Sequence, residues 1–423
     1  MRELLEILKK EVNPALGCTG PISIAFAAAA AREAVGGTPL SAKVRMDKDT
    51  YKNSLCVGIP GTDRMGNDIS VALGAVAGDP EAGLEVLNKI TPEDERKAVE
   101  FMKNVDVDIF WEYTEVGLRI EAEVKTDKGI GKVIVAKTHV NVVYLESNGE
   151  VLLDRLAGLK GTSFDYSKDA ILKYSLGDLF GFAETVPLEE IAFLKEGVEM
   201  NRRLAEAGLS GKTGASFGMA YGELFGENMI VKAKSYTAAA SDARMAGMGL
   251  PAMSCATSGN VGITGMLPLV VMSEELGCSE ERMLRSIALS YLLTILMKSR
   301  IGRLSAICAC SIAAGIGVAA GSTLLLGGGL EDADRAIRNV AGSLAGIVCD
   351  GAKYGCALKL SAAAGVAIES AILATKGYAI PRRNGIVGDN ADDTMAAIGR
   401  LAQEGMTVAT TVMAKIIIDR EKK

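Results

Sequence analysis

The pattern of hydrophobic and polar positions divides the chain near residue 165. After an N-terminal helical region, alternation or short apolar runs predict four strands, at residues 41–46, 55–59, 107–124 and 131–145. The turn sequence KTDKGIG joins the last two. Residues 92–103 predict a polar helix, for which Thr91 is the expected N-cap. The first 165 residues therefore predict a small mixed α/β domain.

Beyond residue 165 the apolar positions recur at helical spacing. Glycine-rich bends separate the helices, which are expected at residues 188–207, 278–297, 331–352, 363–376 and 394–419. A chain of 423 residues is also longer than one ordinary hydrophobic core requires. We therefore expect an α+β protein with a mixed α/β domain at 1–165 and a mostly α-helical domain at 166–423.

Three long stretches carry no charged residue, namely 12–31, 245–273 and 304–330. Each exceeds the ~20 residues that a membrane helix needs. They are rich in Gly, Ala, Ser and Thr, however, and they lack aromatic belts and flanking Lys/Arg asymmetry. We expect buried helices of a large domain rather than membrane spans.

Composition narrows the range of partners and compartments. The net charge is −6 and the aromatic fraction is 5%, and no basic stripe with interleaved aromatics is present, which argues against nucleic acid as a partner. The opening MRELLEILKKEV is a polar amphipathic helix without the apolar core of a secretion signal. The sequence thus predicts a cytoplasmic protein with no membrane or nucleic-acid partner, and it leaves a homo-oligomer open.

Two tight cysteine groups lie near the C-terminal end. Cys308 and Cys310 belong to LSAICACSIAAG, and Cys349 and Cys356 belong to IVCDGAKYGCAL. In a reducing compartment, clustered cysteines are more often metal ligands or catalysts than disulfides. A zinc site usually shows two short Cys-x2-4-Cys hooks, which this spacing does not match. Irregular spacing drawn from separate segments is typical of an iron–sulfur cluster.

The geometry of the second group depends on a turn. Along an unbroken helix the thiols of Cys349 and Cys356 would stand ~10 Å apart. Asp350, Gly351 and Gly355 lie between or beside them and favour a turn that would bring the sulfurs together. The alternative is that these cysteines are small apolar core residues on Ala/Gly-rich helices. Spacing alone leaves both interpretations open.

Two polar segments open helices in apolar surroundings. Cys18 in NPALGCTGP comes just before the apolar helix 22–31, where the positive end of a helix dipole favours the thiolate. The segment SCATSGNVGITGMLP offers backbone N–H groups and short polar side chains, including Ser258 and Asn260, to an anion. The alternatives are an incidental cysteine in a helix-entry loop and a plain loop between buried helices.

Two further residues carry candidate chemistry. Arg244 in SDARMAGMG enters a charge-free stretch, where it would bind a carboxylate in bidentate fashion or form a salt bridge with Asp242 or another acid. His139 in KTHVN is the single histidine of the chain and is therefore the one side chain available for histidine base catalysis. A lone histidine on a strand is more often structural.

Together these segments resemble the L-cysteine desulfidase family, which is related to the iron–sulfur L-serine dehydratases. The resemblance rests on NPALGCTGP, SDARMAGMGLPAMSCATSGNVGITG, LSAICACSIAAG and IVCDGAKYGCALK. It implies a carbon–sulfur lyase that converts the amino acid L-cysteine to pyruvate, ammonia and sulfide. It also implies an oxygen-sensitive [4Fe–4S] cluster with three cysteine ligands and one open iron, and no pyridoxal phosphate.

The resemblance assigns roles to individual residues. Cys349 and Cys356 match the two late cluster ligands, and the earlier ligand falls on Cys308, with Cys310 as the alternate. Cys18 matches the cysteine that accepts the substrate proton, and His139 is the next candidate base. Arg244, Ser258 and Asn260 are expected to bind the substrate carboxylate.

One position departs from the family pattern. Gly20 stands where the family commonly has glutamate, so this chain lacks the contact that the carboxylate would make. The chain also lacks the Ser-rich, His-containing segment of the serine dehydratases near this position, which favours cysteine as substrate. The alternatives are an iron–sulfur L-serine dehydratase, a non-enzymatic cluster-binding redox or sensor protein, a pyridoxal-phosphate lyase and a transporter.

Overall fold

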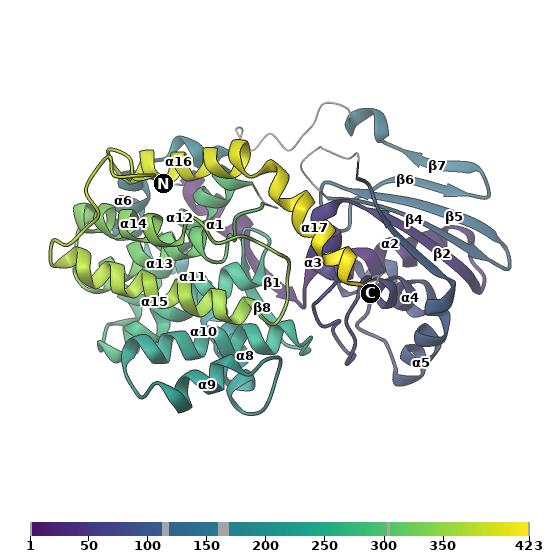
Figure 1. The fold of residues 1–423 in the computed structure, drawn as a ribbon, viewed down its shortest axis with the longest axis horizontal. Coiled ribbons are helices and arrows are strands. Elements are labelled where there is room, and N and C mark those ends of the chain that lie inside the picture. Colours follow the sequence, from purple (N-terminus) through teal and green to yellow (C-terminus); the bar gives the residue numbers. More distant parts are fainter. Residues whose placement is uncertain (1, 112–117, 160–168, 303–304, 422–423) are drawn as a thin grey trace.

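The computed structural model describes residues 2–111, 118–159, 169–302 and 305–421, and it confirms the predicted α+β class (Figure 1). The first part of the chain contains the helices α1 (Arg2–Glu11), α2 (Thr19–Val35), α3 (Lys48–Ser54), α4 (Asn67–Ala77), η1 (Pro80–Glu85), α5 (Pro92–Phe101), η2 (Met102–Asn104) and η3 (Leu156–Leu159). Its strands are β1 (Val12–Leu16), β2 (Pro39–Met46), β3 (Val105–Ile109), β4 (Arg119–Thr126), β5 (Gly129–Ala136), β6 (Val142–Ser147) and β7 (Glu150–Asp154).

A six-stranded sheet of order β3-β2-β4-β5-β6-β7 dominates this sheet half of the molecule. Strands β2 and β3 are parallel, and the other neighbours are antiparallel. Along β4, Ile120, Ala122 and Val124 are buried while the residues between them are more exposed, as period-two alternation requires. Helices α2 and α4 cover the buried face and share its core.

The second part is helical. Its elements are η5 (Ala170–Lys173), α6 (Leu176–Thr185), α7 (Leu188–Ile191), α8 (Leu194–Leu209), α9 (Phe217–Leu224), α10 (Met229–Met245), β8 (Pro251–Cys255), α11 (Gly259–Glu275), α12 (Glu280–Ile301), α13 (Ile312–Leu325), α14 (Leu330–Leu344), α15 (Cys356–Thr375), α16 (Ala391–Arg400), η6 (Leu401–Gly405) and α17 (Thr407–Glu421). We call this part the helical half.

Small residues let the central helices of the helical half approach closely. A Cβ added at Gly317 of α13 would lie 2.3 Å from the backbone oxygen of Ser290 on α12. Only a residue without a side chain fits there, and this close packing of helices accounts for the small residues of the charge-free stretch 304–330. Among the described residues, α15 is the helix long and apolar enough to cross a bilayer, and 61% of its apolar window is buried inside the protein.

The N-terminal segment packs on the helical half and not on the sheet. Leu4 and Leu8 of α1 join the core of the helical half. Strand β1 pairs antiparallel with β8, with Asn13 opposite Ser254. The chain then enters the sheet half through Cys18 and α2. The predicted boundary at residues 165–166 lies outside the described residues.

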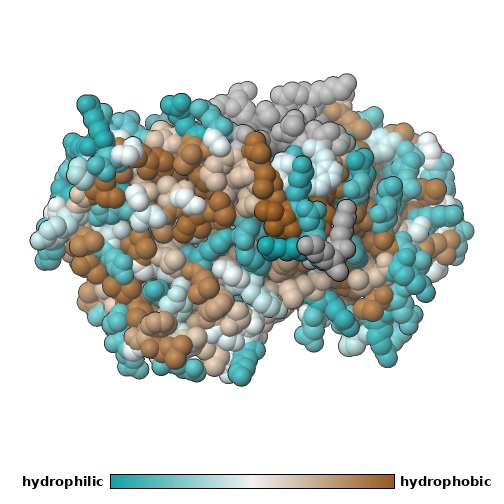
Figure 2. Space-filling model, viewed as in Figure 1, coloured by the Kyte–Doolittle hydropathy of each residue, from teal (hydrophilic) through white to brown (hydrophobic). Residues whose placement is uncertain are grey.

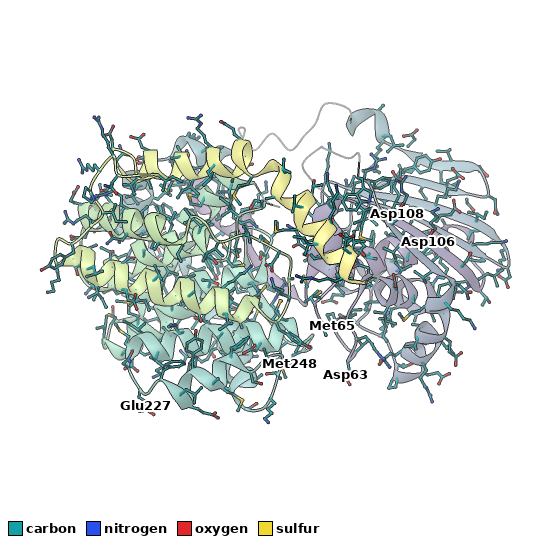
Figure 3. The ribbon with its side chains drawn as sticks, in the orientation of Figure 1. Asp63, Met65, Asp106, Asp108, Glu227 and Met248 are labelled. Carbon is teal, nitrogen blue, oxygen red and sulfur yellow. The ribbon has the colours of Figure 1, made fainter. Side chains whose placement is uncertain are left out.

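Several predicted elements match, and one is wrong. Helix α5 begins after Thr91, which is the predicted N-cap, and Thr91 also forms a capping box with Asp94. Residues 55–59 are not a strand; Gly58 forms an isolated bridge with Met65 and donates its N–H to Met245 of the helical half. Val57 and Gly58 of this run are therefore buried where the halves meet, while Cys56 stays exposed. Met65 and Met248 lie on either side of that junction (Figure 3).

Other predicted segments divide into shorter elements. Residues 107–124 contain parts of β3 and β4, with 112–117 outside the described residues, and residues 131–145 contain parts of β5 and β6. His139 lies in the turn between β5 and β6 and not on a strand, contrary to the prediction. Helix α14 ends at Leu344, so Cys349 lies in the turn that the glycines of this segment favour.

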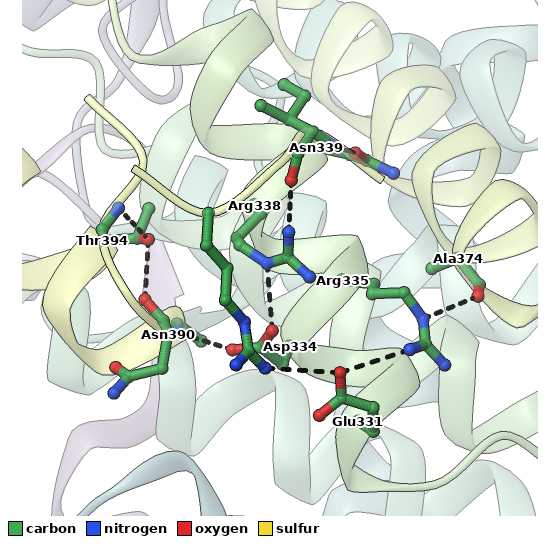
Figure 4. Close-up of polar contacts among 12 residues, drawn as sticks. Glu331, Asp334, Arg335, Arg338, Asn339, Ala374, Asn390 and Thr394 are labelled. Carbon is green, nitrogen blue, oxygen red and sulfur yellow. Dashed lines mark hydrogen bonds and ion pairs between the residues drawn. The ribbon is translucent and has the colours of Figure 1, made fainter. Parts of the chain in front are cut away.

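A buried ion pair fastens the C-terminal segment to α14. Arg338 donates from Nε to Asp334 at 3.0 Å, and the other oxygen of Asp334 accepts from the backbone N–H of Ala391 at 2.6 Å (Figure 4). These contacts fix the start of α16, from which η6 and α17 continue. Helix α17 packs against α3 of the sheet half, while Val408, Val412 and Ile416 stay exposed (Figures 1 and 2).

Candidate active site

A cavity of about 150 Å³ lies where the two halves meet. Every site residue predicted from the sequence lines it, namely Cys18, His139, Arg244, Ser258, Asn260, Cys308, Cys349, Cys356 and the alternate Cys310. Cavities between structural units are common places for active sites, because both units contribute side chains. The tertiary structure thus brings the predicted residues together, and their individual roles stay predictions.

Cys18 is placed by the junction of β1 and α2. It is the N-cap residue of α2 with extended backbone angles, and its side chain makes no capping hydrogen bond. Cys18 is 8% exposed, and its thiol lies 3.9 Å from the backbone oxygen of Asn53 on α3. Gly17 before it has φ +62°, and a Cβ there would lie 2.2 Å from Pro60. The thiol is therefore held at the positive end of a long helix, beside the cavity.

Arg244 links the Cys18 segment to the helical half. Its guanidinium donates to the carbonyl of Gly17 at 2.6 Å and to Oδ1 of Asn260 at 3.1 Å. Asp242 accepts instead from the backbone N–H of Gly218 at 2.9 Å, so the salt bridge considered as an alternative does not form. The Nε of Arg244 is buried and has no hydrogen-bond partner among the described residues. The Nε–H of Arg244 can therefore donate a hydrogen bond to a further acceptor beside the cavity.

The N-terminus of α11 opens onto the same cavity. Ser258 is its N-cap, and Ala256 and Thr257 before it have φ +48° and +65°, a left-handed conformation that is costly for residues other than glycine. The turn is held by Lys298, whose ammonium donates to the carbonyl of Ala256 at 2.8 Å. Because the first N–H groups of a helix lack partners, this end attracts anions.

Two of the cysteine segments are joined by a short β-bridge. Ile307 pairs with Val348, the N–H of Cys308 donates to Ile347 at 2.8 Å, and the N–H of Cys349 donates to Ala306 at 2.6 Å. Backbone pairing therefore fixes the segments of Cys308 and Cys349 side by side, although they lie on different connections between helices.

Cys356 and a cluster of charged side chains lie on the same side of the cavity as Cys308 and Cys349. Cys356 is the first residue of α15, and its thiol lies 3.6 Å from the carbonyl of Gly351. Asp350 pairs with Lys353 and Lys359, and although burial opposes it, these lysines lower the pKa of Asp350 to about 2. Lys359 also donates to the carbonyl of Val348 at 2.8 Å.

The ionisable groups of the cavity differ in proton affinity. A hydrogen bond from Cys310 lowers the pKa of Cys308 to about 6, while burial raises the pKa of Cys356 to about 12. The same hydrogen bond raises the pKa of Cys310. Burial, followed by the charge of Lys298, lowers the pKa of His139 to about 4. His139 is therefore neutral at pH 7 and is a weak base.

The thiols fit a multinuclear group better than a single ion. In the described ranges, no three His, Cys, Asp or Glu side chains converge closely enough to ligate one metal ion. Cys308, Cys349 and Cys356 instead line one cavity together with Lys359. Burial opposes it, but the hydrogen bond to Asp350, and after it the nearby charge of Cys308, raise the pKa of Lys359. An iron–sulfur cluster takes thiolates from separate directions, one on each iron, so the donor set is compatible with it.

Four polar side chains at or beside the cavity matter to the site and were not among the predicted site residues. Asn53 and Lys52 come from α3, and Lys298 and Lys359 come from α12 and α15. Lys298 ends an apolar run on α12, and a charge in such a run was an available signal. The position of Lys52 depends on how the two halves pack, for which the sequence holds no local signal.

Proteins of similar sequence match this chain over nearly its whole length. A UPF0597 protein of Clostridioides difficile strain 630 is 39% identical, over 99% of this chain and 100% of that protein. A UPF0597 protein of Caldanaerobacter subterraneus subsp. tengcongensis is 41% identical, over 99% of this chain and 98% of that protein. A UPF0597 protein of Clostridium tetani is 38% identical, over 99% of this chain and 98% of that protein.

The sequence profile described as serine dehydratase alpha chain matches residues 81–414, a range that contains the candidate ligands Cys308, Cys349 and Cys356. This match and the UPF0597 relatives confirm the family resemblance found in the cysteine-bearing segments. The family is one of dehydratase-like lyases associated with iron–sulfur centres. This chain therefore belongs to the serine dehydratase alpha chain family.

Proposed function

We propose that this protein is a [4Fe–4S]-dependent lyase that cleaves L-cysteine by β-elimination to pyruvate, ammonia and hydrogen sulfide. The observation that carries the proposal is the composition of one cavity, to which the sheet half contributes Cys18 and the helical half contributes Cys308, Cys349 and Cys356. A candidate base and a candidate metal centre thus face the same small volume.

The substrate carboxylate would bind at the N-terminus of α11. The unpaired N–H groups of the first helical turn, Ser258 and the buried Nε of Arg244 all favour an anion there. Lys298 adds a positive charge at the preceding turn. This arrangement would fix the amino acid at one end and leave its Cα and Cβ toward the cysteines.

Elimination requires that the Cα proton and the Cβ sulfur leave the substrate. Cys18, at the N-terminus of α2, would take the Cα proton. Cys308, Cys349 and Cys356 would hold the cluster, which would supply Lewis acidity toward the substrate sulfur. The sulfur leaves as hydrosulfide with the electron pair of the C–S bond, and 2-aminoacrylate remains. Addition of water to its imine tautomer gives pyruvate and ammonia.

Gly20 shapes one wall of the cavity. It lines the cavity beside Cys18, and a Cβ there would lie 3.3 Å from Cβ of Ser54. A glycine there leaves this wall without the carboxylate that the family commonly carries, so the preference for cysteine does not rest on this position. L-serine remains the second candidate, because the matching sequence profile is described as a serine dehydratase chain.

The test is anaerobic purification with iron and sulfide analysis, followed by parallel assays of L-cysteine and L-serine. We expect iron and labile sulfide in the protein, and sulfide and pyruvate released in equal amounts from L-cysteine at the higher kcat/KM. Higher kcat/KM for L-serine would make the protein a serine dehydratase. Cluster without turnover of either amino acid would favour the redox or sensor alternative, and absorbance near 410 nm that borohydride removes would indicate pyridoxal phosphate.

A further inference from the structure

The side chain of Lys52 is fully buried, although Lys52 lies on the short helix α3. Its ammonium lies 2.9 Å from Oδ1 of Asp49 and donates at 3.0 Å to the carbonyl of Cys349. Burying an ammonium costs several kcal/mol unless partners compensate it. One of the two partners belongs to the other half of the molecule, so the buried charge depends on the contact between the halves.

The backbone makes a second contact at the same place. Gly351 has φ +99°, and a Cβ at this position would lie 2.1 Å from the carbonyl oxygen of Lys52. The turn from Cys349 to Gly351 therefore fits closely against the end of α3. On its other side, the turn is bonded to the helical half. The N–H of Cys349 donates to the carbonyl of Ala306, and the carbonyl of Val348 accepts from Lys359.

We propose that Lys52 is a positioning residue for the metal centre, which holds the Cys349 turn in place and supplies a fixed positive charge beside it. This inference rests on the proposed function in one respect, namely that Cys349 ligates a cluster. Lys52 bonds to the backbone of the ligand residue and not to its sulfur, so it acts through Cys349. The sheet half would then stabilise a cluster whose thiolates all come from the helical half.

A buried charge near a cluster affects two measurable properties. The reduced cluster carries one more negative charge than the oxidised one, so a nearby ammonium favours reduction and raises the midpoint potential. A residue that orients a ligand also slows loss of the metal, and removing such a residue typically costs ~10-fold to 100-fold in metal affinity.

The experiment compares anaerobically purified, reconstituted wild type with Lys52→Met, Lys52→Gln and Lys52→Arg. Lys89→Met is the matched control, because Lys89 also pairs with an aspartate of the sheet half, but at an exposed site. Iron and sulfide content, the rate of iron loss to a chelator and the midpoint potential are measured. We expect both neutral variants to lose iron at least ~10-fold faster and to show a more negative potential. Lys52→Arg should keep a wild-type potential, and Lys89→Met should match wild type throughout.

Two results would overturn the inference alone. One is a Lys52→Met or Lys52→Gln protein with wild-type iron content, release rate and potential. The other is a folded Lys52→Arg protein whose potential falls as far as that of the neutral variants, because the charge would then be irrelevant. A wild-type protein that takes up no cluster would instead overturn the proposed function, and this inference with it.

Discussion

The guanidinium of Arg244 donates a 2.6 Å hydrogen bond to the backbone carbonyl of Gly17, across 227 residues of sequence. Because Cys18 follows Gly17 directly, this bond connects the candidate base to the segment expected to bind the substrate carboxylate. Arg244 also bonds Asn260 near the start of α11. One buried side chain thus sets the relative positions of two parts of the candidate active site.

We expect Arg244→Met to raise KM at least ~10-fold and to lower kcat as well, since a charged hydrogen bond to the substrate is worth about 1.5–3 kcal/mol and the Gly17 contact is lost too. Iron content should stay at the wild-type level. Arg282→Met is the control, because Arg282 bonds the carbonyl of Leu324 outside the cavity. An unchanged KM with iron retained would contradict carboxylate binding by Arg244.

Gly259→Ala tests the packing of the same guanidinium. A Cβ at Gly259 would lie 2.4 Å from Nε of Arg244, so the side chain of Arg244 must move. We expect a raised KM and a loss of about 1–3 kcal/mol in the free energy of unfolding, measured by denaturant titration. At Gly211 no heavy atom lies within 4 Å of an added Cβ, so Gly211→Ala should change neither quantity measurably. Equal effects from the two variants would disprove the packing argument.

The cysteines should separate into cluster ligands and others. We expect Cys308→Ala, Cys349→Ala and Cys356→Ala each to lose the broad visible absorbance and most of the iron, because three thiolates hold the cluster in the proposed function. Cys278→Ala should keep the wild-type spectrum, since Cys278 contacts the carbonyl of Leu325 away from the cavity. Loss of the cluster in Cys310→Ala but not in Cys308→Ala would reverse the choice within that pair.

Cys18→Ala should keep the cluster and lose ~10²-fold or more in turnover, as expected when a general base is removed. Iron analysis and sulfide release on the same preparation separate the two effects. Cys56→Ala is the control, because Cys56 is an exposed thiol of the same half outside the cavity lining. A fully active, cluster-loaded Cys18→Ala protein would refute the mechanism, and His139→Gln would then be the next variant to assay.

Asp47 predicts a pH dependence of stability. Burial, and then the charge of Asp49, raise the pKa of Asp47 from 3.8 to about 6. The folded protein therefore binds the proton of the Asp47 carboxyl more tightly than the unfolded chain does. The resulting contribution to the free energy of unfolding is fully present below pH 3.8 and is lost as pH rises through 6. The free energy of unfolding of wild type, relative to Asp47→Asn, should fall by up to ~3 kcal/mol between pH 4 and pH 7.

Urea titrations of both proteins at several pH values would measure this difference. Asp79 is the matched control, because pairing with Lys89 lowers its pKa. Its contribution is lost as pH falls, so wild type relative to Asp79→Asn should change in the opposite direction. A pH-independent difference for Asp47→Asn would mean that Asp47 is ionised in the folded protein at all these pH values.

The sequence by itself determined which local elements form and which chemical groups are available. The alternation of β2 and β4, the capping box at Thr91 and the cysteine groups are all local features, because backbone periodicity and residue chemistry act over a few positions. The same reasoning failed for residues 55–59, since a short apolar run does not reveal whether a neighbouring strand or another half of the molecule buries it.

Only the tertiary structure decided how these groups meet. The pairing of β1 with β8, the bond from Arg244 to Gly17 and the burial of Lys52 against Cys349 all join segments far apart in the chain. Each depends on the packing of complete surfaces and on the compensation of buried charge, which no single segment specifies. The cavity exists because the two halves pack there, so its cysteines could be identified from the sequence, but the burial of Lys52 against the Cys349 segment could not.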